Sequence, residues 1–269
     1  MSTSVLPVFV ALVAVISLLI VPRANNDGAF FKGLAPDGRQ PGLLTLTFSQ
    51  VTTWIFARSL MNAAILGFYY GLWGTLAYAA YYLSFLTGAW IIDSLRFQHG
   101  FSSVQDFLRN RFGFTGTLCY NFVIGIRLIS EVLANLLVIG ILFGITGGDA
   151  YITAILAFST VTLLYSALGG LHASLRTDLF QMAVFLVVLV MLLMTTFSSE
   201  QFSFSLLFNS SFDITEPGPI LLLVALLQVW SYPMHDPVMM DRGFIADRRT
   251  TRRSFYHAAW ISALCIIAF

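Results

Sequence analysis

Charged residues are scarce in this sequence. Asp, Glu, Lys and Arg make up 10% of its 269 residues, whereas a typical soluble domain carries about 25%. A chain with so little charge cannot cover its surface with polar groups in water. The composition therefore argues against an ordinary soluble protein and favours the lipid bilayer as its solvent.

Cysteine is rare as well, and the sequence lacks the common motifs of catalysis. Cys119 and Cys265 lie in or beside apolar segments, so we expect no disulfide framework. We find no metal-ligand cluster, no nucleophile with a partnering base and no glycine-rich phosphate loop. The arginine run at 248–253 is interpreted as an orientation signal, not as a nucleic-acid site. The sequence thus predicts neither an enzyme nor a nucleic-acid binder.

Apolar runs about as long as one bilayer crossing recur along the chain. We expect membrane spans at residues 5–22, 43–70, 73–92, 118–145, 150–168, 178–197, 218–240 and 255–269. The first run is not a cleavable signal peptide, because it lacks a basic leading region and Pro22-Arg23 follows it directly.

Lysine and arginine are distributed unevenly among the predicted loops. Twelve of the 14 basic residues lie in alternate loops, at 23–42, 93–117, the turn holding Arg176, and 241–254, and the loops between them have none. Because basic loops stay in the cytoplasm, we expect these loops inside. The N-terminus and residues 198–217 are then outside a cytoplasmic (inner) membrane.

The two remaining basic residues, Arg58 and Arg127, fall inside predicted spans. Arg58 lies near the middle of span 43–70, where an arginine costs about 2.5–3.5 kcal/mol on insertion scales. A partner, a water-filled cavity or a ligand must offset that cost. The same span also carries several polar residues between Gln50 and Asn62, so it is not a plain membrane anchor.

Span 218–240 is interrupted by the sequence SYPMHDP at 231–237. Its two prolines remove backbone donors and disfavour helix before them. Unwound backbone at membrane depth is tolerated where it lines a cavity or is packed in protein. Two interrupted polar spans predict an inverted-repeat transporter with its binding site at the midplane. If the prolines are considered alone, the alternative is that they form a kink with no functional role.

Four segments, in order along the chain, carry a family resemblance. They read FSSVQDFLRNRFG (101–113), IRLISEV (126–132), GGLHASLRTDLFQ (169–181) and SYPMHDPVMMDRGFIADRRTTRR (231–253). This set resembles the sodium:solute symporter family, whose members include sodium/proline, sodium/galactose, pantothenate and urea symporters. Two residues depart from the family's pattern: Asp236 stands where sodium/proline relatives have glutamine, and Arg58 lies where most relatives lack a cation.

The resemblance implies an all-α polytopic membrane protein with a LeuT-type inverted-repeat fold. Residues 1–269 would form a single transmembrane domain of about eight helices, with a peripheral helix at 5–22, a first five-helix repeat at 43–197 and an incomplete second repeat at 218–269. The family normally has about 13 helices, and this chain ends inside its last apolar run. We therefore expect it to be the N-terminal part of a transporter.

The resemblance also implies a sodium site. Backbone carbonyls of Thr52 and Ile55, at the break of the first core helix, would supply half of the ligands, and a later helix that this chain lacks would supply the hydroxyls. Asp178 would line the ion's exit path. Asp178 is also expected in the first turn of span 178–197, where the helix dipole favours an acid; this role could replace the first or hold together with it.

We expect Arg58 and Asp236 to flank one polar pocket, together with Ser59 and Gln50. Such a pocket would bind a zwitterion, with the carboxylate at Arg58 and the amine at Asp236, or a neutral, doubly polar solute such as urea. A permanent structural salt bridge between the two residues is the alternative.

Two further polar residues lie near these segments. Arg127 and Glu131 are four residues apart on one predicted helix and can pair on one face, and we favour a structural role for that pair. His235, beside the break, is either a proton-sensitive gate or a simply hydrogen-bonded histidine.

These observations leave three hypotheses about function. The first is a secondary transporter that couples sodium to uptake of a small polar or zwitterionic solute across the bilayer. The second is a transporter-like membrane sensor domain of a signalling protein. The third is a non-functional truncated product. The sequence does not indicate an oligomeric state.

Overall fold

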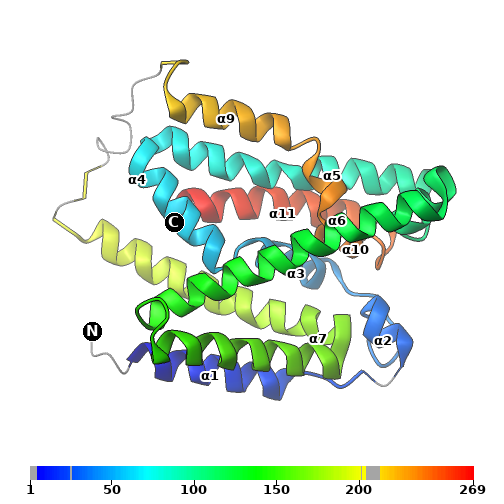
Figure 1. Ribbon diagram of the computed structural model, residues 1–269, viewed down its shortest axis with the longest axis horizontal. Helices are drawn as coiled ribbons and strands as arrows, with labels where there is room; N and C mark the ends of the chain where they lie inside the picture. Colours follow the sequence, from blue (N-terminus) through cyan, green and yellow to red (C-terminus); the bar gives the residue numbers. More distant parts are fainter. Residues whose placement is uncertain (1–4, 25, 201, 204–212) are drawn as a thin grey trace.

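A computed structural model describes residues 5–24, 26–200, 202–203 and 213–269, and every regular element in that part of the chain is helical. The long helices lie side by side in one bundle (Figure 1). The elements are α1 (Val5–Ile20), α2 (Asp27–Lys32), α3 (Leu43–Trp54), α4 (Ala57–Ala80), the short 3-10 helix η1 (Tyr81–Leu83), α5 (Ser84–Ile92), the π-helix η2 (Asp93–Gln98), α6 (Val104–Phe143), α7 (Asp149–Phe197), α9 (Pro217–Gln228), η3 (Tyr232–His235), α10 (Pro237–Arg242) and α11 (Arg248–Ala268).

Three helical stretches of the described chain are long and apolar enough to cross a membrane: Ala57–Gln98, Val104–Phe143 and Asp149–Phe197. Each is longer than a single crossing requires. A straight helix of 49 residues, the length of α7, would measure about 74 Å, against a hydrocarbon core of about 30 Å. The number of crossings therefore depends on where these helices turn.

One glycine with non-helical backbone angles interrupts each of these stretches: Gly71, Gly113 and Gly170. All three have positive φ, a region that glycine enters without steric penalty. At Gly170, a Cβ would also lie 2.6 Å from the carbonyl oxygen of Phe30. The chain reverses at Gly71 within α4 and at Gly170 within α7 (Figure 1). The reversal at Gly170 divides α7 into two arms of membrane length, whereas the part of α4 before Gly71 is shorter than one crossing and reaches that length only together with α3. The total of eight crossings stays a prediction.

The segment before residue 178, which we expected to be a turn, is helical. The chain turns at Gly170 instead, and nothing in LHASLR at 171–176 breaks the helix that follows. Arg176 and Asp178 therefore lie well inside a helical arm.

Two predicted polar loops are also largely helical, because side chains cap new helices inside them. The Ser103 hydroxyl accepts a hydrogen bond from the Asp106 amide and starts α6, so most of 93–117 is helix. Asp247 accepts from the amides of Arg249 and Thr250 and starts α11 seven residues before the predicted span. The predicted loop 198–217 lies partly outside the described residues, since it includes 201 and 204–212.

Both interruptions that the sequence predicts are present. Span 43–70 breaks between α3 and α4, where Ile55 and Phe56 have extended backbone angles. Span 218–240 breaks between α9 and α10, and Asp236 is again extended at φ −112° and ψ 90°. The bilayer-scale apolar runs thus contain unwound backbone at these two places.

A shared hydrophobic core holds the two broken segments. It brings together α3, α5, α10 and α11 around buried residues such as Val51, Phe85, Met239 and Phe255. At Gly88, an added Cβ would lie 2.9 Å from the sulfur of Met239, so α5 approaches α10 closely there. This packing fixes α3 and α10 next to one another.

The predicted loops segregate by charge to the two ends of the bundle. The start of α1, the α6–α7 connection and the end of α11 lie at one end, and these segments lack Lys and Arg (Figure 1). The connections carrying the basic residues, including α2 and the α10–α11 link, lie at the other end. The arrangement fits alternate loops on opposite membrane faces, and which face is cytoplasmic stays a prediction.

Candidate functional site

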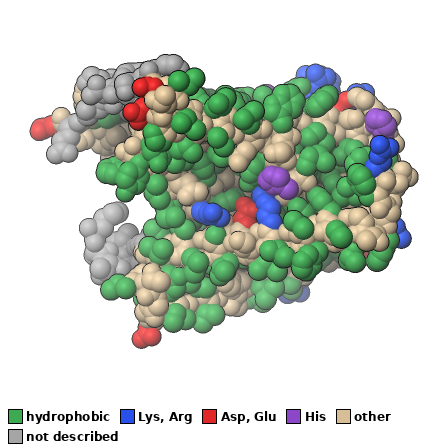
Figure 2. All heavy atoms as spheres, turned by 45° about the horizontal axis from the view of Figure 1, so that its top comes forward, with side chains coloured by type: hydrophobic (Ala, Val, Ile, Leu, Met, Phe, Trp, Pro, Cys, Tyr) green, Lys and Arg blue, Asp and Glu red, His purple; other side chains and the backbone are tan. Residues whose placement is uncertain are grey.

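A central cavity of about 560 Å³ lies where the two breaks meet α6. Figure 2 shows basic, acidic and histidine side chains gathered in a recess at the middle of a largely hydrophobic face. The cavity is lined by Trp54, Phe56, Arg58, Ser59, Asn62, Ile65, Leu66, Tyr78, Tyr81, Tyr82, Arg127, Ser130, Glu131, Gln228, Tyr232 and Asp236. Four charged groups of both signs and several aromatic rings therefore share one space.

Arg58 and Asp236 come from the two different breaks and both line this cavity. Arg58 follows the α3–α4 break directly, and its backbone amide donates to the side-chain oxygen of Asn135 on α6. Its side chain is exposed and has no ion-pair partner within 4 Å among the described residues. The guanidinium thus lines the cavity without a counter-ion among the described residues.

Asp236 has an ion-pair partner that the sequence did not suggest. Its Oδ2 lies 3.7 Å from Nη2 of Arg127, and its Oδ1 accepts from the Met239 amide as the N-cap of α10. Both carboxylate oxygens are therefore engaged within the protein. The alternative that we considered, a permanent salt bridge between Arg58 and Asp236, is not formed, and Arg127 on α6 lies beside the acid instead.

Arg127 is the most connected charge in the cavity. It forms the predicted pair with Glu131, at 3.4 Å, and contacts Asp236 as well. It also donates to the His235 carbonyl at 2.7 Å and to the Tyr232 hydroxyl at 3.2 Å, with its guanidinium 5.4 Å from the centre of the tyrosine ring. Arg127 therefore fixes the unwound segment and is not merely a partner for its helix neighbour.

His235 lies on this unwound segment, with its ring 4.7 Å from that of Tyr232. Its Nδ1 is buried and has no hydrogen-bond partner among the described residues. Neither of the two roles we considered for His235 is tested by this geometry.

Ser59 and Gln50 take different positions. Ser59 is buried, lines the cavity and donates to the Trp54 carbonyl at 2.8 Å, which Tyr82 also contacts. Gln50 is fully buried in α3 and does not line the cavity. It lies more than a turn before the break, so its amide cannot serve the pocket that begins there. Neither amide atom has a partner among the described residues.

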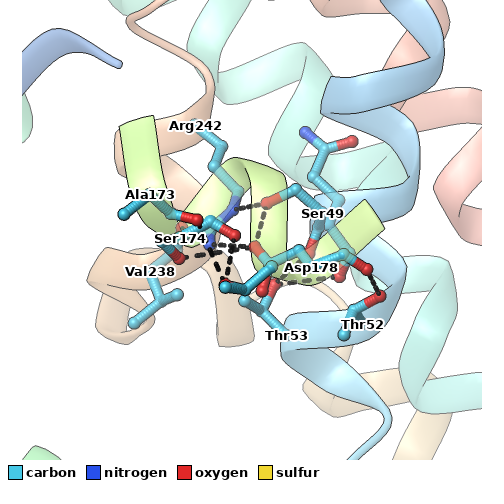
Figure 3. Close-up of polar contacts among 10 residues, drawn as sticks. Ser49, Thr52, Thr53, Ala173, Ser174, Asp178, Val238 and Arg242 are labelled. Carbon is cyan, nitrogen blue, oxygen red and sulfur yellow. Dashed lines mark hydrogen bonds and ion pairs between the residues drawn. The ribbon is translucent and has the colours of Figure 1, made fainter. Parts of the chain in front are cut away.

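A second polar cluster lies beside α3 and contains a buried ion pair (Figure 3). Nη2 of Arg242, the last residue of α10, lies 3.2 Å from Oδ2 of Asp178 on α7. The Ser49 hydroxyl joins them, since it donates to Asp178 and accepts from Nε of Arg242 at 2.8 Å. All three side chains are buried. The cluster ties α3, α7 and α10 together.

This geometry corrects two predictions. Asp178 is not in the first turn of a helix, because its helical arm begins after Gly170. Arg242 is not a loop residue, because it is the last residue of α10, and its side chain is buried and paired. Its placement as the first cation after the broken span could have drawn attention to it, but the sequence does not show which acid it meets.

The predicted sodium ligands lie next to this cluster. Thr52 and Ile55 line a small cavity of about 180 Å³ with Gln181, Met182 and Phe185. The Thr52 hydroxyl donates to the Asp178 carbonyl at 3.1 Å, which orients this stretch of α3 against α7. Carbonyl oxygens at a helix break suit a small, hard cation, but the described lining offers few other oxygens.

A comparison with known protein families shows which family this chain belongs to. The model of the sodium:solute symporter family matches residues 37–242, well over half of the chain. The chain belongs to the sodium:solute symporter family. A comparison with curated proteins found no match. The matched range includes both breaks, the central cavity and the Asp178–Arg242 pair. The protein is therefore an integral membrane protein of the symporter type, and membership of this family implies sodium coupling in general.

Proposed function

We propose that this symporter moves a small solute bearing both a carboxylate and an amine, driven by sodium, and that the central cavity binds it. The charges of the cavity carry the proposal. Arg58 has no ion-pair partner among the described residues, while Arg127 is shared by two acids. Among the described residues, Arg58 is therefore a cation in the cavity without an acid, and one of the two acids that share Arg127 lacks a cation of its own.

The two charged ends of a zwitterion match these groups. Arg58 offers a planar guanidinium that can bind a carboxylate through two hydrogen bonds. Asp236 already caps α10 and faces Arg127, so we now assign the amine chiefly to Glu131, whose side chain is 29% exposed. This revises the assignment expected from the sequence.

A neutral, doubly polar solute such as urea could use hydrogen bonds to the same groups. The free arginine favours the zwitterion, because an unpaired cation at membrane depth is expensive and a bound carboxylate offsets that expense. The two solute classes respond differently to loss of the charge, which makes them separable by experiment.

For sodium, we propose a half site at the carbonyls of Thr52 and Ile55, with Asp178 on the route by which the ion leaves. Gln181, the last residue of the segment GGLHASLRTDLFQ, lines the same small cavity and would supply a further oxygen ligand. The remaining ligands would come from residues outside this chain, as the family resemblance implies. We also propose that the N-terminus faces the outside of a cytoplasmic membrane.

Equilibrium binding tests the solute assignment on the purified chain. Radiolabelled proline, glycine betaine and urea serve as probes, and we compare wild type with Arg58→Gln and Glu131→Gln. A hydrogen bond to a charged group contributes about 1.5–3 kcal/mol. Arg58→Gln should therefore weaken the binding of both zwitterions by roughly 10-fold or more. The affinity for urea should not change.

The matched control is Arg109→Gln, which removes an exposed arginine that does not line the cavity. It should leave all three affinities unchanged. Glu131→Gln should weaken the binding of proline more than that of glycine betaine, because proline carries N–H donors and glycine betaine has none. Unchanged zwitterion affinity in Arg58→Gln would refute the assignment.

A further inference from the structure

One face of α11 has exposed residues in a regular series. At spacings of three and four residues, which lie on one side of a helix, its exposed side chains change from basic to aromatic to aliphatic. We call this series the α11 stripe; its members are Arg249, Arg253, Tyr256, Trp260, Leu264 and Ile267. Neither the central cavity nor the sodium half site uses any of them.

The basic end of the stripe carries more positive charge than the protein neutralises. Arg248, Arg249, Arg252, Arg253 and Tyr256 line an open pocket of about 630 Å³. Arg248 is paired with Asp93 through contacts of 2.6 and 2.7 Å. Among the described residues, Arg249 and Arg253 have no acid within ion-pair distance.

The position of these arginines is unfavourable by itself. They occupy the first turns of α11, where the helix dipole is positive and cations are disfavoured. Arg249 and Arg253 are also four residues apart, so their charges repel one another on the same face. An anion bound between them would relieve both effects.

Arg252 adds a second contact for such an anion. Its Nε lies 3.4 Å from the Tyr256 hydroxyl, and its guanidinium lies 5.5 Å from the centre of that ring. The tyrosine therefore holds one arginine beside the start of the apolar part of the stripe. A polar headgroup and an apolar chain would meet at this point.

We infer that the α11 stripe binds one anionic phospholipid. The phosphate lies among Arg249, Arg252 and Arg253, the glycerol region lies at Tyr256, and an acyl chain runs along Trp260, Leu264 and Ile267. Arg253 to Ile267 spans about 21 Å at 1.5 Å per residue. One leaflet, half of a bilayer 40–45 Å thick, has nearly the same length.

The test measures lipid binding to the purified chain by native mass spectrometry. Phosphatidylglycerol and phosphatidylcholine are the probes, and the variant is Arg249→Gln with Arg253→Gln. A cation near an anionic surface contributes about 1 kcal/mol, so losing two should weaken phosphatidylglycerol binding roughly 30-fold, equivalent to about 2 kcal/mol. Binding of phosphatidylcholine should not change.

The control variant, Arg109→Gln with Arg111→Gln, removes two exposed arginines from another part of the basic end. It should retain wild-type binding. An equal loss in the control would overturn the inference, because the effect would then follow from total charge. Displacement of the lipid by millimolar inorganic phosphate would overturn it in favour of a free-anion site. Tighter binding of a short oligonucleotide than of phosphatidylglycerol would also overturn it.

A second measurement follows the acyl chain. Phosphatidylglycerol with brominated acyl chains quenches nearby tryptophans, so the wild type should lose more fluorescence than Trp260→Phe. Equal quenching in the two proteins would mean that the chain does not lie on the stripe, and the inference would fail.

Discussion

The buried pair between Arg242 and Asp178 allows a quantitative prediction about stability. Replacing Arg242 by methionine keeps much of the side-chain volume but removes the ion pair at 3.2 Å, the contact with Ser49 at 2.8 Å and the hydrogen bond to the Val238 carbonyl at 3.0 Å. Asp178 is left with only serine hydroxyls around its carboxylate. It becomes a buried charge without a counter-ion.

The size of the effect follows from that stranded charge. Breaking a buried pair by removing one partner destabilises a protein by about 3–5 kcal/mol. For a chain of this size, each kcal/mol lowers the unfolding temperature by about 2–4 °C. We therefore expect Arg242→Met to lower it by roughly 10 °C.

The protein's own cysteines provide the assay. Cys265 is buried in the core and Cys119 is exposed, so a Cys119→Ser background leaves one thiol that reacts only on unfolding. A thiol-reactive dye then reports the unfolding temperature in detergent.

The double variant separates a stranded charge from lost packing. Adding Asp178→Asn to Arg242→Met removes the unpaired charge and should restore at least half of the lost stability. The matched control, Arg39→Met, breaks an exposed pair with Asp37 and should leave the unfolding temperature unchanged. If Arg242→Met unfolds at the wild-type temperature, or the double variant is no more stable than the single one, the reasoning is wrong.

Three further predictions concern topology, backbone and transport. In a Cys119→Ser background, Asp213→Cys should be labelled by an impermeant thiol reagent applied outside cells, and Asn110→Cys only after permeabilisation; the reverse pattern would invert the topology. Gly170→Ala should lower the unfolding temperature, because its φ of +54° and a backbone oxygen 2.6 Å away exclude a methyl group, whereas Gly125→Ala, with open space around it, should not. Vesicles holding only residues 1–269 should show no sodium-driven solute uptake above background. Robust accumulation would contradict the proposal that this chain holds only half of the sodium site.

The interrupted spans could be predicted because their causes are local. Two prolines within seven residues and a run of polar side chains around Arg58 both act on their own segment of backbone. The capped helices at 104–112 and 248–254 also have local causes, in Ser103 and Asp247. The apolar runs do not reveal these helices, because hydropathy does not distinguish a polar helix from a polar loop.

Charge pairing could not be predicted in the same way. Arg58, Arg127, Glu131 and Asp236 were all conspicuous as charges in apolar segments, but the choice of partner depends on how α6 crosses the second break. Arg127 and Asp236, which pair, are 109 residues apart in the sequence. The i,i+4 spacing to Glu131 was visible, and it supplied only one of the two acids that Arg127 contacts.

The six residues of α10 connect the two polar clusters. A helix this short does not support itself in isolation, so its ends must be held by other elements. At its start, Asp236 caps the helix and faces Arg127 of α6; at its end, Arg242 pairs with Asp178 of α7. A solute amine bound at Glu131 would leave Arg127 to Asp236 alone at the start of α10, while the end of α10 stays tied to α7, which also lines the proposed sodium half site. Because α9 and α10 are separate helices, a change of contacts at Asp236 acts on α10 without having to bend a continuous helix.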